Sequence, residues 1–285
     1  FLHPAAPANH ETIRRLRDRR ITSFTMDGIP RITRAQPMDA LTSMSTITGY
    51  KSVILAANRF PRFVPLIGTA IGAAPPAKFL ILGAGVVGLQ AIATARRLGG
   101  VVKAFDIRSE ARAAAESLGA KIAGFDVPPE IAHGEGGYAK VLPPEWLEKE
   151  RAALAPLVAE ADVVIASALV PGEVAPVLIP SAMAASMRAG SVIIDVAIDQ
   201  GGNCAATVPG EEVERNRVFI GGLLNIPGSV PVHASWLYGR NMLEYVRNLF
   251  KKGPPEMDLD DEIVRHSLVT RDGTIRHAGY LHVAE

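Results

Sequence analysis

Three glycines and one carboxylate stand at spacings that suit the binding of a dinucleotide. Gly83, Gly85 and Gly88 lie between a short apolar run and a helical pattern, and a second apolar run ends at Asp106. In a strand–turn–helix–strand unit the first glycine permits a tight turn, the second lets backbone N–H groups approach a pyrophosphate, and the third lets the helix pack close to the strand. A carboxylate at Asp106 can accept hydrogen bonds from both ribose hydroxyls and repel a 2′-phosphate. The spacing therefore predicts a site that prefers NAD(H) to NADP(H).

A second group of polar residues precedes a long helix predicted over 38–58. Arg31, Arg34, Gln36 and Asp39 lie close together at the mouth of this helix. Helix capping alone explains Asp39, but it does not explain Gln36 or the two arginines. The side chain of Gln36 offers a donor and an acceptor, as a carboxamide or a ribose requires. The group is therefore a candidate binding site.

The segment 128–144 is a third informative stretch. It is long, polar and rich in glycine, and a pair of prolines bounds it at each end, which is typical of a surface loop. Tyr138 stands in its middle. Because an aromatic residue in such a loop has no core to fill, we expect a lid that closes over a ligand, with Tyr138 at its tip.

Strands and helices alternate along the middle of the chain, so the sequence predicts an α/β fold with a doubly wound parallel sheet. Ligands of such sheets bind at the carboxyl ends of the strands. We therefore expect the turns 83–88, 106–108, 168–172 and 197–204 to line one crevice. The last of these turns, with Asp199 among its residues, would bring polar groups and bare backbone to the nicotinamide end.

The remaining segments predict a second, discontinuous lobe. Residues 1–45 hold a helix and a strand, and the tail after Gly253 holds short strand-like pieces at 263–269 and 274–278. Neither part can build a core alone, so we expect the tail to pack on residues 1–45. The expected domains are 1–45 with 233–285 as an outer lobe, which looks incomplete at its N-terminus, and 46–232 as the NAD(H)-binding lobe.

Composition narrows the function classes. The chain has 30 basic and 29 acidic residues, for a formal net charge of +1. This balance gives no general attraction to nucleic acid, so we expect no nucleic-acid partner. The single Cys204 fits a reducing compartment, and the sequence shows neither a metal-ligand motif nor an apolar run long enough to span a bilayer.

Several segments together resemble the NAD(H)-binding alpha subunit (domain I) of proton-translocating nicotinamide nucleotide transhydrogenase. The matching runs are 26–50, with RAQ and MDAL, 76–88, 134–140 (GEGGYAK), 168–172, 195–210, with GGNC and VPGE, and 233–241 (HASWLYGRN). The runs are spread over essentially the whole chain, and their agreement is too specific to be chance.

The resemblance implies two Rossmann-like lobes and NADH held in the crevice of the glycine-turn lobe. Hydride would pass directly to NADP⁺ on a separate domain, coupled to proton movement through a membrane domain. Arg31, Gln36 and Asp39 would lie around the nicotinamide and the interface with the NADP(H) domain, and Tyr138 would close over NAD(H). The dinucleotide would be held by Gly83, Gly85, Val87, Gly88, Asp106, Ile107, Arg108, Ala168, Leu169, Asp199, Gly202 and Asn203.

The same resemblance implies partners. We expect the NADP(H)-binding and membrane domains or subunits of transhydrogenase, and a homodimer of this chain. The expected location is cytoplasmic, peripheral on the inner face of the plasma membrane through the partner subunits, or on the matrix side in a mitochondrion.

Three departures keep alternatives open. Family members usually begin well upstream of the position that matches Phe1, and they carry Ser-Ser where this chain has Thr42 and Ser43. Asp199 before GGNC, and His3 after a short strand, look more like alanine dehydrogenases, in which the corresponding residues take part in catalysis. An NAD-dependent amino-acid dehydrogenase is therefore the second interpretation, and an NAD-binding module without activity is the third.

Overall fold

The structure, a computed structural model, describes residue 4 and residues 6–132, 139–170, 173–254 and 256–284. The chain divides into two compact units. Residues 45–230 form one of them, called here the central unit. Residues 1–44 and 231–285 together form the other, called the split unit.

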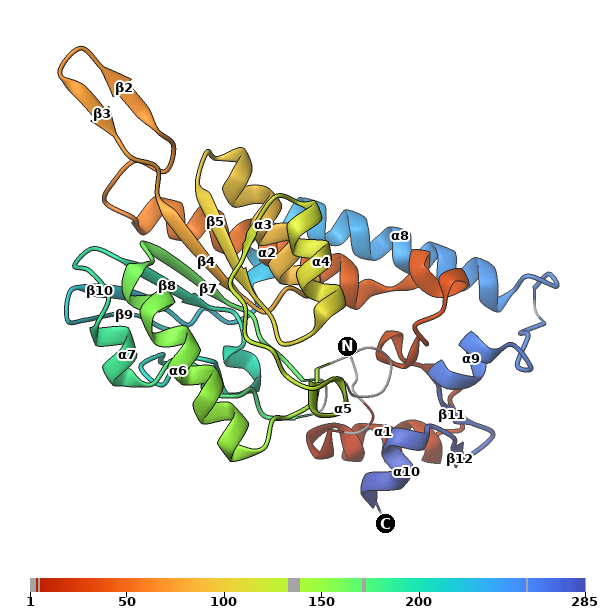
Figure 1. The fold of residues 1–285 in the computed structure, drawn as a ribbon. Helices are drawn as coiled ribbons and strands as arrows, with labels where there is room; N and C mark the ends of the chain where they lie inside the picture. The colour runs from red at the N-terminus through yellow and green to blue at the C-terminus, as the bar shows by residue number, and fades with distance from the viewer. Residues whose placement is uncertain (1–3, 5, 133–138, 171–172, 255, 285) are drawn as a thin grey trace. The chain divides into compact units, whose positions relative to one another are not determined.

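A seven-stranded sheet in the order β6-β5-β4-β7-β8-β10-β9 forms the central unit (Figure 1). Its strands are β4 (Lys78–Leu82), β5 (Val101–Phe105), β6 (Lys121–Ile122), β7 (Val163–Ala166), β8 (Val192–Asp195), β9 (Glu212–Arg215) and β10 (Val218–Gly221). All neighbouring strands pair in parallel except β9, which pairs antiparallel with β10. The chain winds outward from β4 in both directions, so the prediction of a doubly wound α/β sheet is confirmed. The sequence did not predict the antiparallel edge strand β9.

Helices cover both faces of this sheet. They are α2 (Ala40–Arg59), which begins in the split unit, α3 (Val86–Arg97), α4 (Ser109–Ser117), α5 (Pro129–Ala132), α6 (Pro144–Glu160) and α7 (Ser181–Ala185). Successive side chains of a strand point to opposite faces. On β4, Phe79 and Ile81 pack in the core with α2, α3 and α4, whereas Leu80 and Leu82 pack with α6 and α7 (Figure 1). The strands are thus buried on both faces, as continuous apolar runs predict.

Smaller elements complete the central unit. A β-hairpin of β2 (Ile67–Thr69) and β3 (Gly72–Ala74) lies in the segment between α2 and β4, and pairs with no other strand of the described residues. Two 3₁₀ turns, η5 (Ile198–Gln200) and η6 (Ile226–Ser229), follow β8 and β10. The sequence did not predict the hairpin, because its segment is rich in proline and glycine and resembles a linker.

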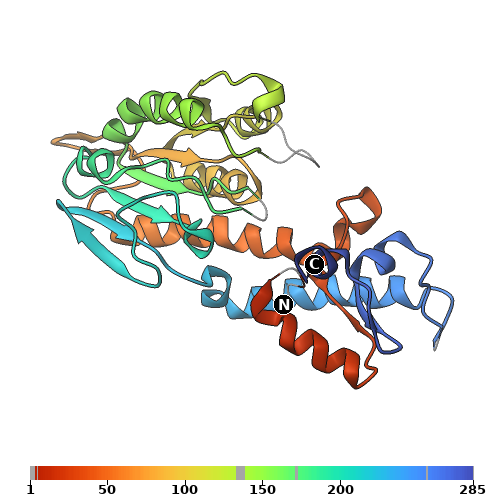
Figure 2. The same ribbon diagram turned by 90° about the horizontal axis from the view of Figure 1, so that it is seen from below.

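The split unit joins both ends of the chain. Its sheet has the order β1-β11-β12, from β1 (Ser23–Phe24), β11 (Leu268–Arg271) and β12 (Thr274–Ile275). Its helices are α1 (His10–Asp18), α8 (Pro231–Leu249), α9 (Glu262–Ser267) and α10 (Ala278–Ala284), with 3₁₀ turns η1 (Pro7–Asn9), η2 (Met26–Gly28) and η3 (Thr33–Met38). Ser23 pairs with Thr270, so the expected packing of the tail on the first residues is confirmed, and Figure 2 shows these red and blue segments together. The predicted strand at 263–269 is wrong in its first part, which is the helix α9.

No helix of the described residues is both long and apolar enough to cross a membrane.

Candidate functional site

The glycine turn joins β4 to α3 at the carboxyl edge of the sheet. Gly83 has φ of +83°, a conformation that favours glycine, and a Cβ there would lie 2.8–2.9 Å from backbone atoms of Ser167 and Ala168. At Gly88 a Cβ would lie 1.9 Å from the carbonyl oxygen of Gly83. Both positions therefore exclude a side chain because the backbone on the other side is too close.

Gly85 differs from the other two glycines. It is the residue before α3, and a Cβ built on it meets no atom of the described residues within 4 Å. Packing within the fold therefore does not require glycine here. The first N–H groups of a helix have no acceptor within the helix and carry a partial positive charge. Open space beside such groups is the arrangement that a pyrophosphate needs.

Asp106 follows β5 and its carboxylate is buried against the glycine turn. Its Oδ2 accepts hydrogen bonds from the backbone N of Ala84 at 2.8 Å and from Nη2 of Arg108 at 2.8 Å. Its Oδ1 accepts from the backbone N and from Nε of Arg108, at 2.9 and 3.0 Å. Four donors therefore occupy the four lone-pair positions of the carboxylate. A ribose hydroxyl can bond to Asp106 only by displacing one of these donors.

The Asp106–Arg108 pair is also electrostatically tight. Burial alone would lower the pKa of the Arg108 guanidinium, but the hydrogen bonds and the negative charge of Asp106 raise it above its ordinary value. The side chain of Arg108 is 18% exposed, so the cation sits at the surface end of the pair. Ile107, between the two, is buried.

The turn after β7 is tied to the loop after β8. Asn203 is fully buried, and its Oδ1 accepts from the backbone N of Ala168 at 2.9 Å. Its Nδ2 donates to the carbonyl oxygens of Ala168 and Pro176, at 2.9 and 2.8 Å. The side chain of Asn203 thus holds the backbone of the 168–176 segment, and the bonds leave it no donor free for a ligand.

Asp195, the last residue of β8, organises that loop from below. Its side chain accepts from the backbone N of Ala197, Asn203 and Cys204, at 2.9–3.2 Å, and from the hydroxyl of Thr207 at 3.0 Å. Burial raises the pKa of Asp195, although these donors oppose the shift. The sequence shows Asp195 only as the end of a strand, since its partners come from a loop that follows.

These bonds join the four predicted turns into one network. Gly83 and Ala84 contact Ala168 and Asp106, and Ala168 is bonded to Asn203. Asp199 lies on the exposed turn η5, while Gly202 is buried and Leu169 is half-buried. The expectation that the turns after β4, β5, β7 and β8 gather at one edge of the sheet agrees with this geometry. The binding roles of the individual residues stay predictions.

A second buried acid lies near Asp106. Glu150, on α6, is only 6% exposed, and no hydrogen bond to its carboxyl group is found among the described residues. Burial, followed by the negative charge of Asp106, raises the pKa of Glu150 to about 7, against the opposing charge of Arg151. The carboxyl group therefore changes protonation near neutral pH, which composition and spacing did not reveal.

In the split unit, the polar group upstream of α2 lies on and beside η3. Arg31 and Gln36 are exposed, and the Gln36 carboxamide has no hydrogen-bond partner in the described part of the chain. Asp39 caps α2, because Oδ1 accepts from the backbone N of Thr42 at 2.8 Å and Oδ2 from its hydroxyl at 2.6 Å. The carboxylate of Asp39 thus has the capping contacts expected at a helix start.

Some predicted residues lie outside the described residues. They include Tyr138, with most of the GEGGYAK segment, and His3. Among the residues that are described, no group of three or more His, Cys, Asp or Glu side chains could hold a metal ion.

Comparison with known proteins agrees with this geometry. Residues 52–278 match the family described as alanine dehydrogenase/PNT, C-terminal domain, and residues 1–48 match its N-terminal domain. The first of the separate chains that make up the NAD(P) transhydrogenase subunit alpha of Rhodospirillum rubrum is 43% identical over 278 residues, which cover 96% of this chain and 72% of that protein.

Two solved structures extend the comparison. The transhydrogenase from Sinorhizobium meliloti has a TM-score of 0.82 and 38% identity, covering 96% of this chain and 73% of its own. An L-alanine dehydrogenase has a TM-score of 0.77 and 30% identity, covering 100% and 73%. The chain belongs to the alanine dehydrogenase/PNT family, and within it the resemblance to the NAD(P) transhydrogenase alpha subunits is confirmed.

Proposed function

We propose that this chain is the NAD(H)-binding component of a proton-translocating NAD(P) transhydrogenase, and that it delivers hydride from NADH to NADP⁺ held on a partner domain. The observation that supports this most is the network of turns around Gly85. It leaves open space at the start of α3, where the family places a dinucleotide, and neither packing nor backbone conformation in the described residues explains a glycine there.

The chain's own residues supply binding and orientation. The first-turn N–H groups after Gly85 and the start of α3 at Val87 would hold the pyrophosphate. The Asp106–Arg108 pair, with Ile107, would meet the adenosine ribose, and the turns at Ala168, Leu169, Asp199 and Gly202 would border the nicotinamide half. NADH, when bound, supplies the hydride. Arg31, Gln36, Asp39 and Tyr138 keep the roles implied by resemblance, around the nicotinamide and over it.

Hydride transfer between two nicotinamide rings moves no proton at the reacting carbon, so positioning suffices. Oxidation of an amino acid requires a general acid and base at the substrate carbon. Asp199, exposed on η5, is the one residue of the described chain that favours this second candidate, an alanine dehydrogenase-like activity. The lower identity to the alanine dehydrogenase structure, 30% against 38%, favours transhydrogenase.

A mixing assay tests the proposal. The chain is combined with an NADP(H)-binding transhydrogenase component, and reduction of thio-NADP⁺ by NADH is followed by absorbance. We expect transfer that depends on both proteins. Reduction of NAD⁺ by L-alanine, with no transfer in the mixture, would overturn the proposal in favour of the dehydrogenase. NADH binding with neither activity would favour a binding module.

We also propose that two copies of the chain form a dimer, through the hairpin β2–β3 and the pocket at its base. An isolated two-stranded hairpin is marginally stable in water. Its tip residue Ile71 is 100% exposed, and Leu66 and Phe63 nearby are 63% and 60% exposed. A pocket of about 690 Å³, lined by Phe60, Phe63, Ala74, Pro75, Pro76 and others, lies beside the hairpin's second strand.

An apolar knob and an apolar pocket on the same segment are what a two-fold contact requires, because each copy offers both to the other. Association with NADP(H)-binding and membrane partners would place the dimer at the inner face of a membrane, without a span of its own in the described residues.

A further inference from the structure

The turn η3 needs support from outside itself. It is a six-residue 3₁₀ helix with Pro37 inside it, and its N-terminal residue has no side-chain cap. Such turns have poor hydrogen-bond geometry and are seldom stable alone. Its inner face is apolar, since Ala35 and Met38 are buried in a cluster with Tyr245, Leu249 and Ile263. Apolar packing holds the turn down, but it does not set the direction of its polar residues.

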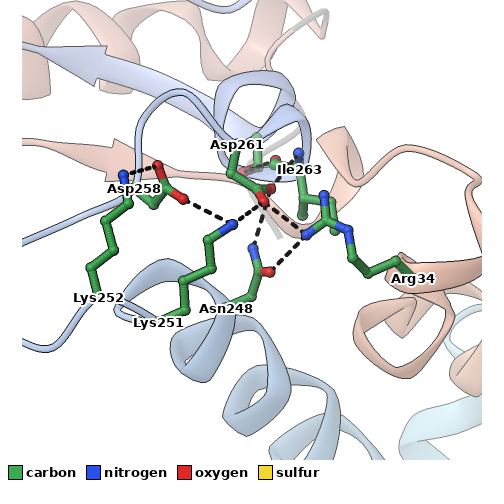
Figure 3. A network of polar contacts seen from close by, with 8 residues as sticks. Arg34, Asn248, Lys251, Lys252, Asp258, Asp261 and Ile263 are labelled. Atoms are coloured by element: carbon green, nitrogen blue, oxygen red, sulfur yellow. Dashed lines mark hydrogen bonds and ion pairs between the residues drawn. The ribbon is translucent and has the colours of Figure 1, made fainter.

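Arg34 ties the first half of the turn to α8 and α9 (Figure 3). Its Nη1 donates to Oδ2 of Asp261 at 2.8 Å and to Oδ1 of Asn248 at 2.9 Å. Asp261 is 3% exposed at its side chain, and it also accepts from Lys251 Nζ at 2.7 Å and, as the cap of α9, from the backbone N of Ile263 at 2.9 Å. The partner of Arg34 is therefore itself fixed by bonds to two helices.

Asn241 ties the second half of the turn to α8. Its Nδ2 donates to the carbonyl oxygen of Pro37 at 2.8 Å. Asn241 is only 6% exposed, and its Oδ1 is buried without a hydrogen-bond partner in the described residues. A buried unpaired acceptor costs free energy. An asparagine that keeps this cost is explained by the bond that its other end makes to Pro37.

Gln36 stands between these two anchors. Arg34 precedes it by two positions and Pro37 follows it, so the backbone that bears Gln36 is held on both sides. We propose that Arg34, with its partner Asp261, and Asn241 are positioning residues: they fix the Gln36 carboxamide in the orientation that hydride transfer uses. This inference rests on the proposed function for the role of Gln36, and on the bonds above for the positioning itself.

Two variants and two controls test the inference. Arg34→Ala removes the first anchor. Asn241→Leu removes the second while it also removes the unpaired buried acceptor, so the loss of stability stays small. Lys252→Ala is the control inside the same cluster, because Lys252 bonds only to Asp258, at 3.0 Å. Arg247→Ala is the control on α8, since it removes an exposed ion pair with Glu244. Arg34→Lys keeps the charge but loses the planar guanidinium.

We expect Arg34→Ala and Asn241→Leu to lower the single-turnover rate of hydride transfer by about ten- to a hundredfold, since a small misplacement of a positioned group has this effect. The dissociation constant for NADH, from a fluorescence titration, should change by less than about threefold. Arg34→Lys should recover part of the rate, and both controls should match the unmodified chain. Equal losses in rate and affinity, or no loss in rate, would overturn the inference.

A second readout separates this inference from the proposed function. Amide hydrogen exchange in the peptide that covers residues 33–39 should speed up in Arg34→Ala and Asn241→Leu but not in the two controls. If the unmodified chain transfers no hydride, the proposed function fails while this measurement still tests the anchors. Unchanged exchange in both variants would overturn the positioning role whatever the activity.

Discussion

Asp106 and Arg108 are joined by three hydrogen bonds, one from the backbone N of Arg108 and two from its guanidinium, at 2.8–3.0 Å. A carboxylate and a cation therefore sit together at the place where the proposed site must distinguish a ribose hydroxyl from a 2′-phosphate. The carboxylate holds the cation in place, so selectivity depends on the pair and on both of its charges.

The first prediction concerns this pair. Asp106→Ala frees the Arg108 cation and leaves the N–H of Ala84 without its acceptor, so NADH binding weakens and a 2′-phosphate gains a partner. The preference for NADH over NADPH should fall by roughly ten- to a hundredfold, about 1.4–2.8 kcal/mol. Parallel equilibrium titrations with the two nucleotides measure it. Asp126→Ala is the control, since the Asp126 side chain is 97% exposed. Unchanged selectivity in Asp106→Ala would show that the ribose is read elsewhere.

The second prediction contrasts two glycines of the same turn. Gly88→Ala forces a methyl group against the Gly83 carbonyl and should lower the free energy of unfolding by about 1–3 kcal/mol. Gly85→Ala meets open space at φ of −77°, so the free energy of unfolding should change by less than about 1 kcal/mol. NADH affinity should nevertheless fall at least about tenfold in Gly85→Ala. Chemical denaturation and calorimetric titration give both quantities. Normal binding by Gly85→Ala would place the pyrophosphate away from this turn.

The third prediction follows from Glu150. Its pKa in the folded chain is raised to about 7, so the fold binds a proton that the unfolded chain releases near pH 4. The stability that this proton provides is present below about pH 4 and is lost as the pH rises toward 7. Glu150→Gln should therefore raise the free energy of unfolding by about 2–4 kcal/mol at pH 8 and leave it nearly unchanged at pH 4. Denaturation series at both pH values test this, and an equal effect at the two would contradict a titrating Glu150.

The fourth prediction concerns the proposed dimer. Ile71→Asp places a charge at the hairpin tip, where the side chain is fully exposed, so the fold itself should not change. The dimer should dissociate to monomer at micromolar concentration, as measured by sedimentation velocity. Val174→Asp provides the comparison, because Val174 is a 76% exposed apolar residue of the same unit that lies outside the hairpin. A dimer that survives Ile71→Asp but not Val174→Asp would move the interface away from the hairpin.

The parts of the fold that could be predicted are those in which local pattern and burial agree. The unit β4–α3–β5 has apolar strands buried on both faces and a glycine turn between them, and the sequence locates it within a few residues. The strand β9 escapes prediction because Glu212–Arg215 is mostly charged, as suits an exposed edge. In α9 the β-branched Ile263 and Val264 favour a strand, whereas the cap from Asp261 starts a helix there.

The candidate site was predictable to the same extent. Glycines and acids could be located because each has a recognisable place in the local pattern. Their partners could not, since Asn203 reaches Ala168 and Asn241 reaches Pro37 across long stretches of chain. Sequence spacing shows which groups are near a turn, but the direction of each side chain depends on distant backbone.

Pairing of Ser23 with Thr270 has a consequence for synthesis on the ribosome. The central unit is continuous, so it can fold as soon as its last strand emerges, whereas β1 must wait for β11. Closing so long a loop is slow, and domains generally fold as units in the order of their synthesis. The N-terminal segment, with the turn that bears Gln36, therefore spends most of translation without its C-terminal partners. During that interval it is the part of the chain most open to proteases and chaperones.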